Sequence, residues 1–314
     1  MQRLRSEGGI CDAATPPSVY VELRPLAAHR HLVDHLFILR DCGRLTGPER
    51  SVFASPFCEV ALVGQRRGAG DALVWQTLQT PPRFGRQPRP AALHGWLIGV
   101  RYDPLLSGPE DLAALQEAAA DLDRVVGRDG GLDAIVHLLD RALDAGAATE
   151  PGIGRPAPGS RQRQTIGAWT RALSAIGADG VVKVAELAGA TRIPARTLQR
   201  HVRARTGLSP KRYTALRRFD AALRGVAGGE AAFADVAMAT GYADQSHMTV
   251  DLAQHTGASP GRLRAFARRQ NDQEAVRFFQ DAAVRERIRL FINAPEADGE
   301  MSEQRRRATG PRIR

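Results

Sequence analysis

Short apolar runs of strand length, separated by turn residues, fill the first third of the chain. They span residues 19–26, 57–63, 72–78 and 93–100, with proline and glycine between them, as in TPPRFGRQPRP at 80–90. Residues 29–40 fit either a strand or a short helix. The pattern predicts a β-rich, barrel-like domain over residues 19–146, preceded by a flexible N-terminus at 1–18.

The spacing of apolar residues changes to a helical period after residue 108. Apolar side chains recur every three or four residues through 108–145, which predicts a tail of helices on the first domain. Residues 147–163 (AATEPGIGRPAPGSRQR) contain three prolines, three glycines and almost nothing apolar, so we expect a linker. Residues 164–270 are helical in pattern nearly throughout. The predicted fold class is α+β, with a β-rich domain followed by an all-α domain.

The positive charge of the chain is concentrated in the helical part. Of the formal net charge of +10, residues 155–270 hold +12, whereas residues 1–154 hold −3 and residues 271–314 hold +1. A basic block joined to a slightly acidic one indicates a polyanion-binding module attached to a domain with another role. A solvated arginine-rich surface is the alternative that charge alone leaves open.

Composition and motifs exclude several other classes of protein. No apolar run reaches the roughly 18 residues of a membrane span, and the N-terminal segment lacks the apolar core of a secretory signal. The three cysteines, Cys11, Cys42 and Cys58, form neither a disulfide framework nor a zinc spacing. We therefore expect a cytoplasmic protein that does not associate with a membrane.

No set of residues in the sequence indicates catalysis or a bound metal. There is no GxSxG, P-loop, GxGxxG or HExxH motif. His29, His31 and His35 cluster around Asp34, but no fourth ligand lies near in sequence, which favours a satisfied polar patch over a metal site. We expect no cofactor and no enzymatic activity.

A tandem duplication organises the basic segment. TGLSP at 206–210 returns as TGASP at 256–260, and a pair of an apolar residue and an alanine precedes each at nearly the same distance. Two units are too few for a solenoid, whose repeats need several neighbours to bury a continuous core. The duplication therefore predicts two similar small helical units.

Each unit reads as two helices joined by a tight turn. The second helices cover about 195–205 and 244–255, and each is followed by a glycine suited to cap its C-terminus. Ala188 and Ala237 are small where two helices must approach closely, as a helix-turn-helix requires. A helix over 210–226 joins the units, and it would fix the distance between two recognition helices that enter major grooves roughly 34 Å apart.

The residues of this duplication resemble the paired helix-turn-helix domain of the AraC/XylS family of bacterial transcription regulators. The matching elements are AELAGATRIPARTLQRHVRARTGLSPKRYTALRRFDAAL at 185–223 and FADVAMATGYADQSHMTVDLAQHTGASPGRLRAF at 233–266. The N-terminal half is similar, more loosely, to the β-rich sensory domain of one AraC branch. The resemblance implies a DNA-binding domain over 164–270 and a sensory or dimerisation domain before it.

The resemblance also assigns candidate DNA contacts, and the side-chain chemistry agrees with it, because Arg suits guanine and Gln suits adenine in the major groove. The expected base contacts are Arg196, Gln199 and Arg200 from the first recognition helix and Gln245, Ser246, Thr249 and Val250 from the second. The expected phosphate or positioning contacts are Arg192, Arg203, Arg212, Arg217, Arg218 and His247. The family usually has Arg at the position of Val250, and Asp251 follows it, so we expect weaker phosphate attraction at the second helix or contact of Val250 with a thymine methyl group.

The sequence thus predicts a one-component transcription regulator of the AraC type that binds double-stranded promoter DNA. RNA polymerase and a small-molecule effector are further candidate partners, and the chain would act as a monomer or a homodimer at the nucleoid. Two alternatives stay open: an enzyme domain fused to a DNA-localising module, and a non-specific nucleic-acid-binding protein. Residues 271–314 are expected to form an amphipathic and basic C-terminal tail.

Overall fold

The computed structural model describes residues 18–43, 45, 51–66, 73–88, 93–105, 107–108, 112–127, 131–148, 189, 194–268 and 278–294. The expected flexible N-terminus up to residue 17, the linker beyond residue 148 and Arg192 lie outside these residues. So does the first helix of the first unit apart from Gly189. No helix in the described part of the chain has the length and apolar character to cross a membrane.

Six antiparallel strands form the main sheet, in the order β5-β4-β7-β2-β1-β8. They are β1 (Ser18–Leu23), β2 (His35–Cys42), β4 (Cys58–Arg66), β5 (Leu73–Thr80), β7 (His94–Tyr102) and β8 (Ile288–Ala294). Two short strands, β3 (Ser51–Val52) and β6 (Gln87–Pro88), pair in a second sheet. The four apolar runs predicted as strands are all strands.

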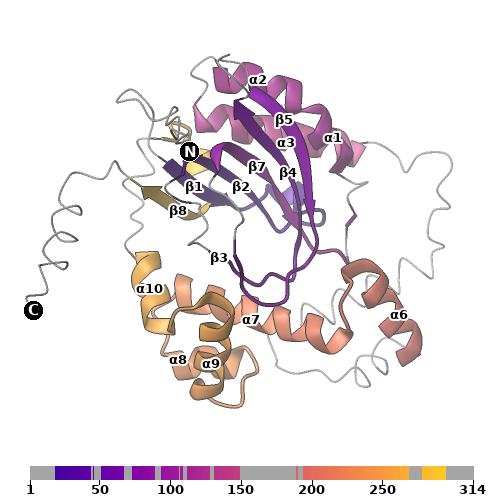
Figure 1. Ribbon diagram of the computed structural model, residues 1–314, viewed down its shortest axis with the longest axis vertical. Helices are drawn as coiled ribbons and strands as arrows, with labels where there is room; N and C mark the ends of the chain where they lie inside the picture. Colours follow the sequence, from indigo (N-terminus) through magenta and orange to yellow (C-terminus); the bar gives the residue numbers. More distant parts are fainter. Residues whose placement is uncertain are drawn as a thin grey trace, which may run out of the picture.

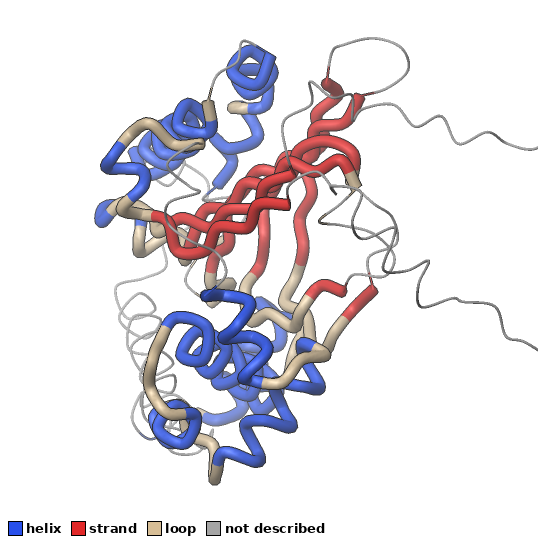
Figure 2. The backbone as a smooth tube through the Cα atoms, turned by 90° about the vertical axis from the view of Figure 1, so that its left-hand side faces the viewer, coloured by secondary structure: helices blue, strands red, loops and turns tan. Residues whose placement is uncertain are grey.

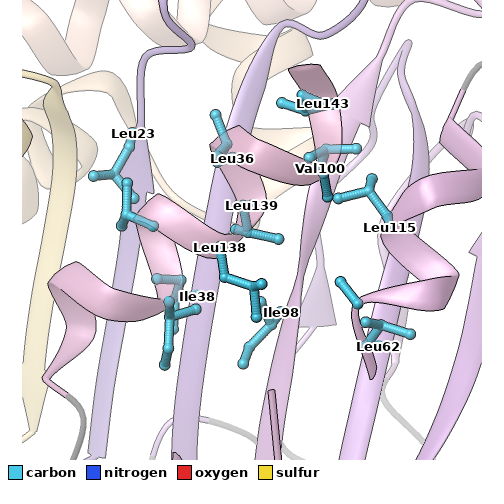
Figure 3. Close-up of a cluster of buried hydrophobic side chains, with 14 of the residues drawn as sticks. Leu23, Leu36, Ile38, Leu62, Ile98, Val100, Leu115, Leu138, Leu139 and Leu143 are labelled. Atoms are coloured by element: carbon cyan, nitrogen blue, oxygen red, sulfur yellow. The ribbon is translucent and has the colours of Figure 1, made fainter. Parts of the chain in front are cut away.

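Three helices cover one face of the sheet: α1 (Ala113–Glu117), α2 (Ala119–Gly127) and α3 (Leu132–Ala148) (Figures 1 and 2). Figure 3 shows strand residues such as Ile38 and Ile98 meeting helix residues such as Leu115 and Leu139. All four are at most 2% exposed. Every second residue of a strand points to this face, and every third or fourth residue of a helix points back at it. These side chains pack together and form the core.

The segment at 29–40, which the sequence left open, resolves mainly into a strand. A single 3-10 turn, η1 (Ala27–His29), precedes β2. β2 lies between β1 and β7 in the sheet, so its apolar residues Leu36 and Ile38 are buried by the helices on one face. Burial in a central strand explains the nearly continuous apolar run that obscured its period.

The C-terminal segment corrects the expected domain division. Residues 271–314 were expected to form a tail after the DNA-binding domain, but β8 pairs with β1 as the edge strand of the N-terminal sheet. A short helix, α12 (Ala282–Arg285), precedes it, and Phe279 and Val284 join the core of that half. A short, mostly apolar segment such as IRLFINA does not distinguish strand from helix by period alone, and its partner strand lies more than 260 residues earlier in the chain.

The remaining described helices form the second half: α6 (Ala195–Thr206), α7 (Pro210–Gly228), α8 (Phe233–Ala239), α9 (Gln245–Thr256) and α10 (Pro260–Arg268). α7 lies along the centre, with α6 at one end and α8, α9 and α10 at the other (Figure 1). Their core includes Leu216, Phe219 and Val226 from α7 and Met248 and Leu252 from α9. The predicted fold class, a β-rich half followed by an all-α half, is confirmed. The β-rich half was expected to be barrel-like, but its described strands form an open sheet with β5 and β8 at the two edges.

Candidate nucleic-acid interface

The first recognition helix, α6, is fixed by one buried face and exposes the residues expected to read DNA. Val202 is 1% exposed, and Thr206 Oγ1 donates to the Val202 carbonyl at 2.7 Å. Arg196, Gln199 and Arg200 are exposed, as is Arg203 one turn later. The three expected base-contacting side chains thus lie on the surface of one helix.

The second recognition helix, α9, begins at a well-defined cap. The Asp244 carboxylate accepts a hydrogen bond from the His247 backbone N–H at 2.7 Å, which satisfies a donor that the first turn leaves free. Met248 and Leu252 are fully buried, whereas Gln245 and Ser246 are exposed. The inward pair therefore turns the polar start of α9 to the surface.

Val250 and Thr249 complete the outer surface of α9. Val250 is 64% exposed, although valine is apolar, and Thr249 is half-buried. A large exposed apolar side chain at the centre of a recognition helix is suited to contact a thymine methyl group. Val250 therefore lies on the accessible surface of α9, where the resemblance predicts a DNA contact.

The TGxSP repeat is explained by two identical helix endings. Gly207 and Gly257 adopt φ angles of 70° and 77°, in the left-handed region that favours glycine, and so end α6 and α9. Thr256 donates to the Leu252 carbonyl at 2.7 Å, the counterpart of the bond that Thr206 makes. Ser209 and Ser259 each accept from a backbone N–H three residues later, at 3.4 Å in both units. The repeat therefore sets the same exit geometry from both recognition helices.

α7 holds the two recognition helices at a fixed separation. Its 19 residues give a length of about 28 Å, comparable with the spacing of successive major grooves. Leu216, Phe219 and Ala222 are fully buried along one side.

Asp251 does not face outward beside Val250. The Tyr242 hydroxyl donates to Asp251 Oδ2 at 2.6 Å, and the Arg218 guanidinium lies 4.6 Å from the centre of the Tyr242 ring. Burial raises the pKa of Tyr242, and the hydrogen bond to Asp251 raises it further. The carboxylate, 19% exposed, is thus held by Tyr242 within the helical half.

The three arginines that we expected α7 to direct at phosphates have partners inside the chain. Arg212 lies 5.3 Å from the centre of the Phe84 ring and stays exposed. Arg217 Nη1 lies 3.2 Å from Asp103 Oδ2, and Arg218 stacks on Tyr242 as described above. Of the three, Arg212 is the one whose side chain is exposed.

Asp103 joins the two halves of the molecule. Its Oδ1 accepts a hydrogen bond from the fully buried Tyr213 hydroxyl at 2.8 Å, and its Oδ2 pairs with Arg217. Burial raises the pKa of Tyr213 well above its ordinary value, and the charge of Asp103 adds to this. The buried hydroxyl therefore stays protonated and donates to the carboxylate.

A second contact between the halves centres on Asp34. Its Oδ2 lies 2.8 Å from Arg224 of α7, 3.2 Å from Arg289 of β8 and 2.6 Å from His35 Nδ1. Burial alone would raise the pKa of Asp34, but the hydrogen bond from His35 and the charge of Arg224 hold it well below its usual range. Arg224 also pairs with Asp220 of the same helix at 2.6 Å. Its guanidinium group is therefore held by one carboxylate of α7 and by one of the N-terminal half.

A third contact ties the last turn of α6 to the N-terminal half. Arg205 donates to the backbone carbonyls of Pro104 at 2.8 Å and of Ser107 at 3.1 Å. The sequence did not predict these three contacts, because each joins residues about 100 or more positions apart and no local pattern marks such pairs.

The N-terminal sheet also contains a buried charge network that the sequence did not indicate. Glu59 accepts from Arg83 at 2.9 Å and from Arg101 at 2.7 Å, and Arg101 reaches Glu22 at 3.4 Å. Burial opposes ionisation of Glu59, but the charges of Arg101 and Arg83 lower its pKa to about 2. Carboxylates and guanidinium groups are balanced here, so the network is internally neutralised.

The histidine cluster that the sequence singled out is divided between two sites. His29 Nε2 lies 2.7 Å from Asp144, whereas His35 pairs with Asp34. No group of three metal-ligating side chains is present among the described residues.

Cys58 is a buried free thiol whose pKa burial raises to about 11.

Comparison with known proteins finds a matching domain model and several similar solved structures. Residues 187–265 match the family model described as a helix-turn-helix domain. No curated protein matches the chain. An AraC-type transcriptional regulator from Chromobacterium violaceum is similar in structure, with 16% identity over 35% of this chain and 96% of that chain and a TM-score of 0.32.

Two further solved structures are similar to the chain. The DNA-binding domain of AdpA, a global transcriptional factor in complex with a target DNA, shows 23% identity over 35% of this chain and 97% of that chain, with a TM-score of 0.32. ToxT from Vibrio cholerae shows 12% identity over 80% of this chain and 96% of that chain, with a TM-score of 0.34. The family match at 187–265 includes α6, α7, α8 and α9 and both copies of the TGxSP ending. This part of the chain therefore matches a helix-turn-helix domain.

Proposed function

We propose that the protein is a sequence-specific promoter-binding regulator that inserts α6 and α9 into successive major grooves. The observation that carries the proposal is that two helices with the same C-terminal glycine cap and the same exit geometry expose their outer faces from opposite ends of α7. Two similar heads on one rigid helix match the periodic surface of B-DNA. Such a protein would act in the cytoplasm, at the nucleoid.

The proposed base contacts are Arg196, Gln199 and Arg200 from α6 and Gln245, Ser246, Thr249 and Val250 from α9. Arg203, Arg212 and His247, all exposed, are the proposed phosphate contacts, together with Arg192 outside the described residues. Arg217 and Arg218 are instead proposed to position α7, because the first pairs with Asp103 and the second with Tyr242.

The two heads are proposed to differ in strength. α6 carries Arg196, Arg200 and Arg203 on its surface, whereas α9 carries no arginine or lysine. Contacts with guanine and with phosphate are thus concentrated in α6. α9 would instead contact adenine through glutamine and a thymine methyl group through Val250. The preferred DNA site would be asymmetric, with one dominant half.

The test is selection of bound DNA from a random pool by the full chain at about physiological salt, where non-specific affinity is suppressed. A motif with two half-elements about one helical turn apart is expected. The double variant Gln199→Ala/Arg200→Ala should lose the dominant half, and Gln254→Ala, a second exposed glutamine on α9 outside the proposed contacts, is the matched control. Binding that tracks salt alone, without enrichment, would instead support a non-specific nucleic-acid-binding protein.

We further propose that the N-terminal half controls DNA binding, through a small-molecule effector, through dimerisation or through both. The contacts of Asp103 and Asp34 with α7 support this, because they couple the sheet to the helix that spaces the two heads. An effector would act by binding one arrangement of the halves more tightly than another. A regulator rather than an enzyme is favoured, since residues 187–265 match a helix-turn-helix domain.

A further inference from the structure

The β5 strand is an open edge of the main sheet. It pairs with β4 along its whole length, from Leu73 opposite Arg66 to Thr80 opposite Glu59, and no other described strand pairs with it. Figure 1 shows β5 at the border of the sheet. Its backbone N–H and C=O groups on the outer side are therefore open to a further strand.

The composition of β5 lacks the features that usually protect an edge. The strand reads LVWQTLQT, without a charged residue, proline or glycine over eight positions, and its register with β4 has no bulge. Natural edge strands are usually blunted by such residues or by irregular pairing. The opposite edge, β8, carries Arg289, which is paired with Asp34.

The side chains of β5 are also exposed on both faces of the sheet. Residues 76–79 are all exposed, and the apolar Val74 and Leu78 are 40% and 45% exposed. Their register with Gln65 and Ala61 places both on the face of the sheet opposite that covered by α1–α3. An uncharged edge with two exposed apolar side chains on one face is a surface for strand addition.

We propose that two copies of the chain associate through β5, antiparallel about a twofold axis at Gln76. An axis perpendicular to the sheet keeps each face on its own side, so residues opposite one another must point to the same face. Centring the axis on Gln76 places Val74 opposite Leu78 of the second copy, and the symmetry repeats this pair. The two exposed apolar side chains of each copy then cover those of the other.

A second copy fits this edge better than a partner of different chemistry. The strand offers no charge for an oppositely charged partner to recognise, and its exposed apolar pair is complementary to itself in the symmetric register. Eight residues at about 3.4 Å, with a sheet about 10 Å thick, give an end-on contact of roughly 270 Å² per copy. This is below the size of permanent interfaces, so the dimer is weak and forms at high concentration or where two chains are held close, as on neighbouring DNA sites.

Cysteine cross-linking of the full chain tests the register without DNA, and so separately from the proposed function. Opposed residues of an antiparallel pair have Cα atoms about 4.5–5.5 Å apart, within the range of a disulfide. Gln76→Cys, opposite its own copy, should give a covalent dimer on oxidation with diamide. Gln79→Cys is the matched control, because it is equally an exposed glutamine of β5 but would lie about 20 Å from its own counterpart.

The wild-type chain, treated alike, gives the background from its native cysteines. Light scattering at about 100 μM adds a second measurement: Leu78→Lys should lower the average mass toward the monomer, and Leu26→Lys, at a similar 40% exposure away from β5, should not. Equal cross-linking of Gln76→Cys and Gln79→Cys, or a mass that Leu78→Lys leaves unchanged, would overturn the proposal.

Discussion

Removal of the hydroxyl of Tyr213 tests whether the two halves stabilise each other. Tyr213→Phe deletes one oxygen atom and leaves Asp103 buried with its charge still paired to Arg217. A buried hydrogen bond to a charged group contributes about 1.5–3 kcal/mol, so the free energy of unfolding should fall by about 2 kcal/mol. Because the bond joins the two halves, its loss should destabilise elements in both of them.

Peptide-resolved hydrogen exchange distinguishes the sides. Tyr213→Phe should speed exchange about 30-fold both in α7 and in β7, which leads into Asp103, since about 1.4 kcal/mol corresponds to tenfold. Tyr242→Phe is the matched control. It removes the Tyr242–Asp251 bond, which lies wholly within the helical half, and should speed exchange in α9 while leaving β7 unchanged.

A double-mutant cycle identifies the partner. Asp103→Ala should cost more than Tyr213→Phe, because it leaves Arg217, 18% exposed, without its carboxylate. The two changes together should be less costly than their sum by about 2 kcal/mol, the coupling expected of a direct bond. Unchanged exchange in β7 with Tyr213→Phe, or additive costs in the cycle, would refute the reasoning.

Two further predictions concern pH and DNA. Because the folded-state pKa of Glu59 is about 2, below its ordinary value of 4.5, ionisation of Glu59 stabilises the fold above about pH 4.5, and this stabilisation is lost as the pH falls toward 2. The shift corresponds to roughly 3 kcal/mol, so Glu59→Gln should be less stable at pH 7 and lose less stability between pH 5 and 2 than the wild type in urea titrations; parallel curves would contradict this. Val250→Arg should strengthen DNA binding and steepen the salt dependence by about one phosphate contact, whereas Leu26→Arg, which adds the same charge at an exposed apolar residue away from α9, should leave the slope unchanged. Equal slopes for the two variants would place Val250 away from DNA.

The features that the sequence predicted well are those fixed by near neighbours. Gly207 and Gly257 end their helices in the left-handed conformation, and Asp244 caps α9, because each acts on backbone groups within one turn of itself. The outward surfaces of α6 and α9 follow in the same way from buried residues such as Val202 and Met248. Local capping and helical period thus suffice to define the candidate DNA-reading surface.

The features that the sequence did not predict depend on contacts between distant segments. β8 is a strand because β1 offers it backbone partners, and its own apolar run does not show this. Arg217 and Arg224 are basic residues on a helix beside a DNA-binding unit, so phosphate contact is the natural expectation. Instead, Arg217 pairs with Asp103 and Arg224 pairs with Asp34. Charge pattern along a helix indicates where cations lie but not which of them have an internal partner.

α7 therefore contacts both halves of the molecule through different side chains, and their arrangement indicates how control would pass between the halves. Leu216 and Phe219 pack into the helix-turn-helix core, while Arg217 and Arg224 bind Asp103 and Asp34. Seven residues, about 10.5 Å, separate the two arginines along the helix. Two anchors at that distance fix the direction of α7 as well as its position, whereas one anchor would permit it to tilt. An event in the N-terminal half that released either carboxylate would thus free the orientation of α7, and with it the alignment of α6 and α9, without breaking the helical core.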